Sequence, residues 1–282
     1  MNHVPSSMWR PARVVENRQV SNGSMWLTLE SQDAFPAAYE PGHVLGLGLD
    51  LEQGFIRHAY TVSRGEPLLR RFSHLYRVIT GGRMTNHLVK LSTGDTLYFH
   101  GPFHTPIQQE VQSSAECIAL IGTGAGIGPL FGYAEKTLRE GEKRSLTLYA
   151  GFHEASHICM IPELEALSQT YANFTSEMSL THPPHGWNGL VGRVTESVPE
   201  RFGPGNLQSY HFHLVGNGDM VHLMRRALLR AGVSMGRVSI ETYFNHHSEP
   251  PKDRIEEVAN RFLAKPSSNP QDGFTKSIFQ MK

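Results

Sequence analysis

Apolar and polar residues alternate over short stretches in the first hundred residues, and turn residues separate these stretches. Such alternation is typical of β-strands with one buried face. Several short strands with frequent turn signals predict a small antiparallel barrel. We expect one helical segment at 83–91, and strands at 12–20, 24–31, 43–49, 57–63, 74–80 and 95–100.

From residue 113 on, buried apolar runs alternate with segments of helical spacing, which predicts a parallel sheet with helices on both faces. Later strands are expected at 146–151, 174–180, 211–216 and 238–244, and helices at 162–169, 195–202 and 219–230. The fold class is therefore an N-terminal six-stranded antiparallel β-barrel, residues 10–112, followed by a five-stranded parallel α/β domain, residues 113–245. A C-terminal extension, 246–282, begins with polar residues and Pro250-Pro251 and then shows helical spacing at Ile255, Val258, Ala259 and Phe262. This pattern fits either a loosely attached helix with a disordered end or a flap or partner-docking element.

The first strand of the α/β domain lies in the stretch 116–130, where five apolar residues run into Gly122, Gly124, Gly126 and Gly128. Pro129 follows, and proline suits the first turn of a helix. A strand, a glycine turn and a helix N-terminus form a site for an anion or a dinucleotide. The spacing differs from Gly-x-Gly-x-x-Gly, and the next strand, 146–151, has no acidic residue at its tip to hold a ribose.

Two signals in the barrel half point to a second anionic ligand. In His58-Ala59-Tyr60-Thr61, strand alternation places His58 and Tyr60 on one face and Arg57 on the other. The glycines of 81–88 and the helix start after them offer exposed N–H groups to a phosphate. Either signal alone also fits ordinary strand packing or a simple helix start.

Composition narrows the function classes. The 282 residues carry 26 basic and 26 acidic side chains, so nothing favours nucleic acid or an anionic membrane. We expect no membrane span, and the absence of a signal peptide at the N-terminus predicts a cytoplasmic protein, which we expect to be a monomer. The two cysteines are too few for an all-cysteine iron–sulfur cluster, which needs four thiolates.

A motif of the metal-binding type competes with this interpretation. His153-Glu154-Ala155-Ser156-His157 matches the His-Glu-x-x-His pattern of zinc proteases. That mechanism needs both histidines on one helix face, whereas this stretch directly follows a β-type segment. With 16 histidines in the chain a chance match is unsurprising, so we predict no metal site. His246 and His247 are expected to be surface residues, and His211 and His213 are expected to be strand residues, not ligands.

Three motifs in this order resemble those of the ferredoxin–NADP reductase family, a flavin barrel followed by a nicotinamide-nucleotide domain. They are His58–Thr61 for Arg-x-Tyr-Ser, Gly82–Leu88 for Gly-x-x-Ser-x-x-Leu, and Gly122–Pro129 for Gly-Thr-Gly-x-Gly-Ile-x-Pro. The segments 214–220 and 241–244 are similar to two later motifs of the family. The similarity covers about residues 10–245.

The resemblance implies FAD, in preference to FMN, and NAD(P)H as co-substrate. It assigns catalytic positions to Tyr60, Thr61 and Tyr243. The implied flavin site comprises Arg57, His58, Ala59, Tyr60, Thr61, Tyr76, Arg77, Val78, Arg83, Met84, Thr85, Thr123, Tyr243 and Phe244. The implied NAD(P) site comprises Gly122, Gly124, Gly126, Pro129, His182, Arg193, Gly216, Asn217 and Met220.

Some positions depart from the family pattern. His58 stands where the family has an arginine for the flavin phosphate, and Val215 stands where it has a cysteine beside the nicotinamide. Phe152 and His182 stand where arginines for the 2′-phosphate are expected. Because phenylalanine cannot replace arginine as a phosphate ligand, the sequence leans towards NADH.

The function that the resemblance implies is a reductase passing electrons from NAD(P)H through FAD to a ferredoxin- or flavodoxin-like carrier. Candidate docking cations for an acidic carrier are Arg64, Arg70, Arg71, Arg225 and Arg226. Two alternatives stay open: a reductase of free flavin or another small acceptor, and a partner-binding flavoprotein with weak hydride transfer.

Overall fold

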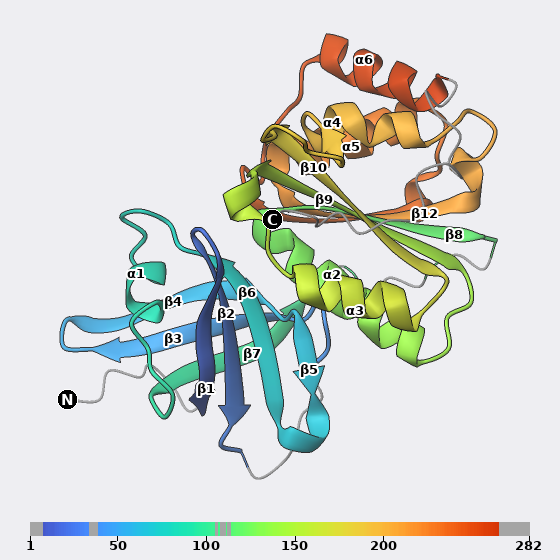
Figure 1. The fold of residues 1–282 in the computed structure, drawn as a ribbon. Coiled ribbons are helices and arrows are strands. Elements are labelled where there is room, and N and C mark those ends of the chain that lie inside the picture. Colours follow the sequence, from blue (N-terminus) through green and yellow to red (C-terminus); the bar gives the residue numbers. More distant parts are fainter. Residues whose placement is uncertain (1–7, 34–38, 105–106, 108–110, 112–113, 265–282) are drawn as a thin grey trace. The chain divides into compact units, whose positions relative to one another are not determined.

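The computed structural model describes residues 8–33, 39–104, 107, 111 and 114–264, which belong to two compact units (Figure 1). The first unit combines 1–109 with 127–142, and the second combines 110–126 with 143–282. The predicted domain boundary at 112 and 113, the N-terminal residues 1–7 and the end of the extension from 265 lie outside the described residues.

The first unit is built on an antiparallel sheet, which confirms the predicted barrel-type half. Within the described residues the sheet has seven strands, in the order β4-β3-β7-β1-β2-β6-β5. All six predicted strands are present, and the additional one is the three-residue β5. The bounds are β1 Arg10–Ser21, β2 Ser24–Ser31, β3 Val44–Leu51, β4 Gly54–Thr61, β5 Arg64–Glu66, β6 Arg71–Arg77 and β7 Thr96–His104.

Between β6 and β7 the chain forms a helix, α1, that is shorter than predicted. It spans Thr85–Leu88, whereas the sequence pattern suggested 83–91. The chain before it is held in a turn, because the N–H of Gly82 donates to the carbonyl of Ile79 at 2.7 Å. The hydroxyl of Thr85 also accepts the N–H of Ile79, at 3.1 Å. A short 3-10 helix, η1 Pro67–Leu69, joins β5 to β6.

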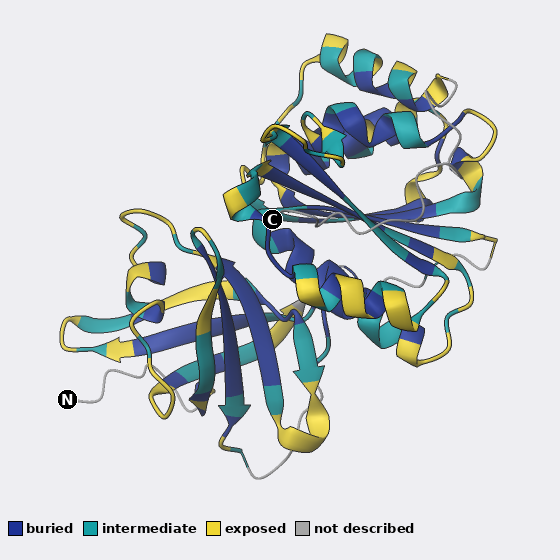
Figure 2. Cartoon of the chain, in the orientation of Figure 1, coloured by how far each residue is buried: buried dark blue, intermediate teal, exposed yellow. Residues whose placement is uncertain are grey.

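The core of this unit is formed by alternate residues along the strands, and its buried residues are coloured dark blue in Figure 2. Leu45, Leu47 and Leu49 of β3 face inwards, and Phe72 and Phe99 from neighbouring elements are fully buried beside them. Burying such side chains is the main stabilising contribution to a unit of this size.

Helix α2, Ile127–Arg139, packs against β5 and β6 of the first unit. A Cβ at Gly132 would overlap the carbonyl of Ser63, so glycine is needed for this close approach. The guanidinium of Arg64 donates to both carboxylate oxygens of Glu135, at 2.8 and 2.7 Å. Arg64, a candidate docking cation, is therefore already paired within the unit.

The second unit is built on a parallel sheet, which confirms the predicted α/β half. The described strands form the order β11-β10-β9-β8-β12-β13. The five predicted strands are present, and a two-residue edge strand, β11, raises the number to six. The bounds are β8 Cys117–Thr123, β9 Ser145–Glu154, β10 Phe174–His182, β11 Leu190–Val191, β12 Tyr210–Asn217 and β13 Val238–Phe244.

Helices cover both faces of this sheet. Figure 1 shows α3, Ile161–Thr170, on one face, and α4, Val194–Ser197, α5, Gly218–Arg230, and α6, Lys252–Leu263, on the other. The helix predicted at 195–202 is split into α4 and the 3-10 helix η5, Pro199–Arg201, because Pro199 cannot continue the hydrogen-bond ladder. The other 3-10 turns of this unit are η3 Gly124–Gly126, η4 Ala155–His157, η6 Leu207–Ser209 and η7 Met235–Arg237.

The helical spacing predicted in the extension is confirmed by α6. Its apolar side chains Val258, Ala259 and Phe262 are buried in the same core cluster as α5 and β12. The first part of the extension is thus an integral element of the second unit. No described helix is both long and apolar enough to cross a bilayer.

Among the residues that the structure describes, three histidines are fully buried, one in the first unit and two in the second. His74 donates from Nδ1 to the carbonyl of Thr61 at 2.8 Å, and burial lowers its pKa to about 4. Burial also lowers the pKa of His211 to about 4 and that of His213 further below its usual range. His211 and His213 are strand residues, as expected, and both are buried in β12.

These histidines predict a loss of stability on mild acidification. In the unfolded chain a histidine gains its proton near pH 6.5, whereas folded His74 remains neutral to about pH 4. The unfolded state therefore binds more protons in this window, and the free energy of unfolding falls by about 1.4 kcal/mol per pH unit for each such group. His74→Leu should show a shallower dependence in urea unfolding between pH 7 and 5. The exposed His185 provides the control, His185→Leu, which should keep the wild-type slope; equal slopes in all three proteins would contradict the prediction.

Candidate functional site

The order of the parallel strands locates a ligand site before any side chain is considered. From β8 the chain proceeds through β9 and β10 to one edge of the sheet, then returns to place β12 on the other side of β8. In open α/β sheets ligands bind outside the carboxyl ends of the strands at such a switch point. The loops after β8 and β12 are therefore the first candidates in the second unit.

The loop after β8 consists of backbone with little side-chain cover. Gly122 lies in β8, and the 3-10 turn η3 comes next, in which Gly124 has a φ of 54°. At Gly126 an added Cβ would lie 2.5 Å from the carbonyl oxygen of Val215. Only glycine allows η3 to approach β12 so closely. Pro129 is the third residue of α2.

Residues at the end of β12 meet the same loop. Gly216 has a φ of 145° and lies against Thr123, whose hydroxyl accepts the N–H of Asn217 at 3.4 Å. Asn217 caps α5 by accepting the N–H of Asp219 at 3.1 Å. The structure thus brings Thr123, Gly216 and Asn217 together, whereas Met220 is buried in the core beneath them.

The strand after α2 ends in a carboxylate, which corrects the sequence analysis. β9 continues three residues beyond Gly151 and ends at Glu154, so an acidic residue does lie at its tip. Sequence analysis ended the strand early because glycine at 151 resembles a strand end; in the structure Gly151 pairs with Ser179 of β10 and the ladder runs on. An acid at this tip is the residue type that holds a nucleotide ribose.

Three imidazoles surround this carboxylate. The rings of His153 and His182 lie 4.5 Å apart, and those of His153 and His157 lie 6.2 Å apart. The hydroxyl of Ser156 donates to Glu154 and, together with the neighbouring imidazoles, lowers the pKa of this carboxyl. His182 therefore lies beside an anion, not in an arginine-like phosphate site. Phe152 is buried in β9.

The His-Glu-x-x-His motif does not lie on one helix. His153 belongs to β9, and His157 belongs to the 3-10 turn η4. Within the residues described, no group of three or more histidine, cysteine or acidic side chains has a geometry that could hold a metal ion. Glu154 is the acidic residue of this His-Glu-x-x-His motif, so the motif was the feature of the sequence that could have drawn attention to it.

Three further predicted residues lie at the ends of strands of the same sheet. Arg193 comes after β11, is exposed, and its N–H donates to Glu196 at 3.2 Å. Tyr243 and Phe244 are the last residues of β13, and half of the Phe244 side chain is exposed.

In the first unit Tyr60 is the centre of an aromatic cluster. Its ring makes edge-to-face contacts with His58 at 5.7 Å, His74 at 6.2 Å and Tyr76 at 6.2 Å. Burial raises the pKa of the Tyr60 phenol, which stays neutral at physiological pH. Thr61 is buried, and its carbonyl accepts the hydrogen bond from His74. A planar ligand would meet a rigid, uncharged ring here.

Asn17, which sequence analysis did not single out, connects this cluster to α1. Its amide donates to the carbonyls of Leu88 and Leu91 at 2.8 and 2.9 Å, and its oxygen accepts the hydroxyl of Tyr76 at 3.2 Å. Met84 and Thr85 are buried in this region, and the Thr85 hydroxyl is bonded to Ile79. The Thr85 hydroxyl is thus used to hold the loop before α1 through its bonds to Ile79.

Free cations on the first unit suit an anionic cofactor. Arg10, Arg13, Arg64 and Arg71 all form ion pairs with carboxylates. In contrast, three arginines from β4, β6 and the loop before α1 are exposed and form no ion pair with any described residue; they are Arg57, Arg77 and Arg83. Exposed guanidinium groups without a carboxylate partner are the kind of side chain that binds a phosphate-bearing flavin.

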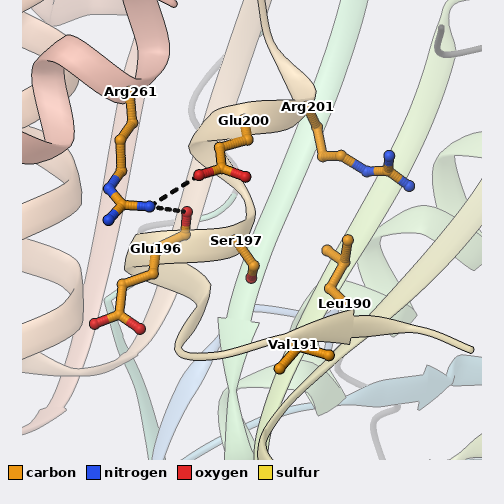
Figure 3. Close-up of a pocket in the computed structure, with 7 residues that line it drawn as sticks. All are labelled: Leu190, Val191, Glu196, Ser197, Glu200, Arg201 and Arg261. Carbon is orange, nitrogen blue, oxygen red and sulfur yellow. Dashed lines mark hydrogen bonds and ion pairs between the residues drawn. The ribbon is translucent and has the colours of Figure 1, made fainter. Parts of the chain in front are cut away.

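The second unit also contains a polar pocket of about 310 Å³ lined by residues of β11, α4, η5 and α6 (Figure 3). Its two guanidinium groups are already neutralised. Arg261 donates to Glu200 at 2.9 Å and to the carbonyl of Glu196 at 3.4 Å, and Arg201 is bonded to Glu177. The pocket therefore offers no free charge to a nucleotide.

The contact of η3 with β12 predicts that Gly126→Ala is not tolerated. The new methyl group would meet the backbone of Val215, which cannot move without disturbing the sheet, so we expect a loss of about 2 kcal/mol in stability. Affinity for NAD⁺ should also fall. Thermal unfolding and nucleotide titration measure the two effects. Gly205 has open space around it, so Gly205→Ala should match the wild type; equal behaviour of both variants would refute the argument.

Comparisons with known proteins agree with this geometry. Residues 11–106 match the oxidoreductase FAD-binding domain, and residues 120–226 match the oxidoreductase NAD-binding domain. Ferredoxin–NADP reductase B of Sorangium cellulosum is 29% identical over 82% of this chain and 96% of that protein. NADH-cytochrome b5 reductase 1 of Laccaria bicolor is 26% identical over 79% of this chain and 73% of that protein.

Solved structures share the fold. A ferredoxin NADP⁺ reductase from Neisseria gonorrhoeae with bound FAD and NADP has a TM-score of 0.69, with 19% identity, over 84% of this chain and 99% of that one. The ferredoxin reductase in carbazole 1,9a-dioxygenase has a TM-score of 0.72, with 19% identity, over 84% and 69%. With both domain types matched in order along one chain, the protein belongs to the ferredoxin–NADP reductase family of flavin- and nicotinamide-binding oxidoreductases.

Proposed function

We propose that this protein oxidises a nicotinamide nucleotide, passes its electrons through bound FAD, and delivers them to a small electron carrier. The observation that carries the proposal is the presence, in one chain, of the Tyr60 cluster with free arginines and of a glycine-lined switch point. In this proposal residues 10–112 bind the flavin and residues 113–245 bind the nucleotide.

The cofactor supplies the redox chemistry: FAD accepts a hydride from the nucleotide and releases its two electrons to the acceptor. The residues of the chain bind and orient. Tyr60 offers a flat apolar ring, and Thr61 is fixed through its carbonyl by His74. Arg77 and Arg83 are proposed to neutralise the pyrophosphate, whereas Arg57 lies on the other face of β4 from Tyr60. Gly124, Gly126 and Gly216 let the nucleotide approach bare backbone.

The acceptor is proposed to be a ferredoxin or flavodoxin, a choice supported by the similarity to ferredoxin–NADP reductase B. A cytochrome b5-like haem protein is the second candidate, because NADH-cytochrome b5 reductases are also similar to this chain. Among the candidate docking cations, Arg64 and Arg71 are held in ion pairs, which leaves Arg70 and the α5 residues Arg225 and Arg226 for an acidic partner. The two alternative functions, a reductase of free flavin and a partner-binding flavoprotein with weak hydride transfer, are distinguished from this proposal by the experiment that follows.

The purified protein should be yellow, release FAD on denaturation, and bleach when NADH or NADPH is added without oxygen. Adding oxidised ferredoxin should restore the colour at a rate that falls with salt, since electrostatically steered association weakens on screening. Restoration by free flavin alone, independent of salt, would favour the small-acceptor alternative. A flavin that stays oxidised would favour the partner-binding alternative, and a colourless protein that takes up neither FAD nor FMN would disprove the flavin site.

We further propose that NADH is the preferred nucleotide. Glu154, at the tip of β9, can accept hydrogen bonds from the ribose hydroxyls of NADH. The same carboxylate repels the 2′-phosphate of NADPH, and His182 beside it offers at most a weak cation. Arg193 is the one remaining cation that sequence analysis assigned to this side, and its N–H is bonded to Glu196.

Replacing the acid should shift this preference. Glu154→Gln removes the negative charge and keeps the size, so KM for NADPH should fall and KM for NADH should rise. The ratio of the two specificity constants should change by about tenfold or more. Adding a cation with His182→Arg in the same background should shift the ratio further. Glu165→Gln, an exposed acid of α3, is the control and should leave the ratio unchanged. An unchanged ratio in Glu154→Gln would refute this role.

A further inference from the structure

After β13 the chain forms a turn, residues 245–248, that contacts the first residues of α5. Asn245 has a left-handed φ of 53°, and its carbonyl accepts the N–H of Ser248 at 2.9 Å. The carbonyls of Phe244 and Asn245 lie so close to Gly218 that an added Cβ there would overlap the Asn245 oxygen. The turn of residues 245–248 therefore rests directly on the α5 backbone, and only glycine at 218 permits this contact.

The carboxylate of Asp219 holds this turn with both of its oxygens. Oδ2 accepts the side-chain amide of Asn245 at 2.9 Å, and Oδ1 accepts the hydroxyl of Ser248. The N–H of Asp219 donates to Asn217 at 3.1 Å, so the same residue also belongs to the cap of α5. Hydrogen bonds to an ionised acceptor are stronger than neutral ones, and a negative charge is favoured in the first turn of a helix.

Two histidines form further hydrogen bonds that hold the 245–248 turn. His222, from the second turn of α5, donates from Nε2 to the carbonyl of His246 at 2.9 Å. The Nδ1 of His246 is hydrogen-bonded to the hydroxyl of Thr242 at 2.8 Å. The turn is thus bound to α5 and to the strand that precedes it.

The extension fixes the other end of the segment. After the turn the chain enters α6, whose Glu256 is paired with Arg230 of α5 at 2.7 Å and whose Phe262 is buried in the core. A chain that ended at Phe244 would have neither Ser248 nor α6. The residues beyond β13 therefore give the last strand an attachment that the strand itself does not contain.

We propose that Asp219 is a positioning residue for hydride transfer, which it supports by holding the 245–248 turn and, through it, the end of β13. The inference rests on the proposed function. Asn217 and Phe244 are paired at the end of the β12–β13 ladder. Asp219 extends this connection, because it follows Asn217 in the sequence and binds the residues that follow Phe244. It touches neither nucleotide nor flavin in this proposal; it acts by fixing Tyr243, Phe244 and the Gly216–Gly218 loop relative to one another.

The proposal has a physical basis in the sensitivity of hydride transfer to placement. A displacement of about 1 Å at the reacting groups can lower a rate by about a hundredfold. Phe244 is half exposed and is the last residue of β13, so its position depends on the attachment of the 245–248 turn that follows it. Loss of the Asp219 contacts should therefore lower the rate of the chemical step more than the binding of the nucleotide.

The test compares Asp219→Asn and Ser248→Ala with Asp253→Asn in the full chain loaded with FAD. Asp253 is an exposed acid in the first turn of α6 and serves as the matched control. We expect hydrogen exchange in residues 242–250 to become about tenfold faster in the first two variants. Flavin reduction by NADH in a stopped-flow instrument should slow by about tenfold, with KM and FAD content within about twofold of the wild type. The control should match the wild type in every measurement.

Three results would overturn the proposal. Unchanged exchange in both variants would show that Asp219 does not hold the turn. Faster exchange with wild-type flavin reduction would show that the turn is structural only. If the wild-type protein itself is not reduced by NADH or NADPH, the proposed function fails and this role fails with it, while the exchange data still report separately whether the Asp219 contacts exist.

Discussion

The close approach of backbone to backbone at the carboxyl ends of β8, β12 and β13 is the contact on which the rest of the second unit depends. Gly126 lies against Val215, Gly216 against Thr123, and Gly218 against the carbonyls beyond β13. Each contact is possible because no Cβ intervenes, and together they leave polar backbone groups at one edge of the sheet. An edge of this kind offers backbone N–H groups to an anion even where charged side chains are few.

The first unit meets a different requirement, because a flavin needs a flat apolar surface and a phosphate site close together. Buried polar groups fix the strands that carry the aromatic cluster of Tyr60. His74 holds the carbonyl of Thr61 beneath the Tyr60 ring, and Asn17 joins Tyr76 to the end of α1. Such networks are costly to bury unless their hydrogen bonds are made, so they specify one arrangement of the surrounding strands. The exposed Arg57, Arg77 and Arg83 form no ion pair with any described residue.

The negative charge of Glu154 at the tip of β9 departs from the family pattern, in which arginines for a 2′-phosphate are expected in this region. A carboxylate surrounded by imidazoles is a poor site for a second phosphate and a good site for ribose hydroxyls. The extension is a second departure, since α6 completes the core of the unit and the segment before it is bonded to Asp219. Both features modify the nucleotide unit without changing its sheet, which is how one fold can serve different acceptors and nucleotides.

The sequence by itself determined the two sheet types, the glycine loop and the helix of the extension, because periodicity and turn residues act over a few positions. Only the tertiary structure decided where β9 ends, since Glu154 joins the strand by pairing with His182 of β10. Burial of His211 depends in the same way on neighbouring strands. The contacts of Asp219 reach Asn245 and Ser248, 26 and 29 residues away, and local patterns carry no information about partners at that separation.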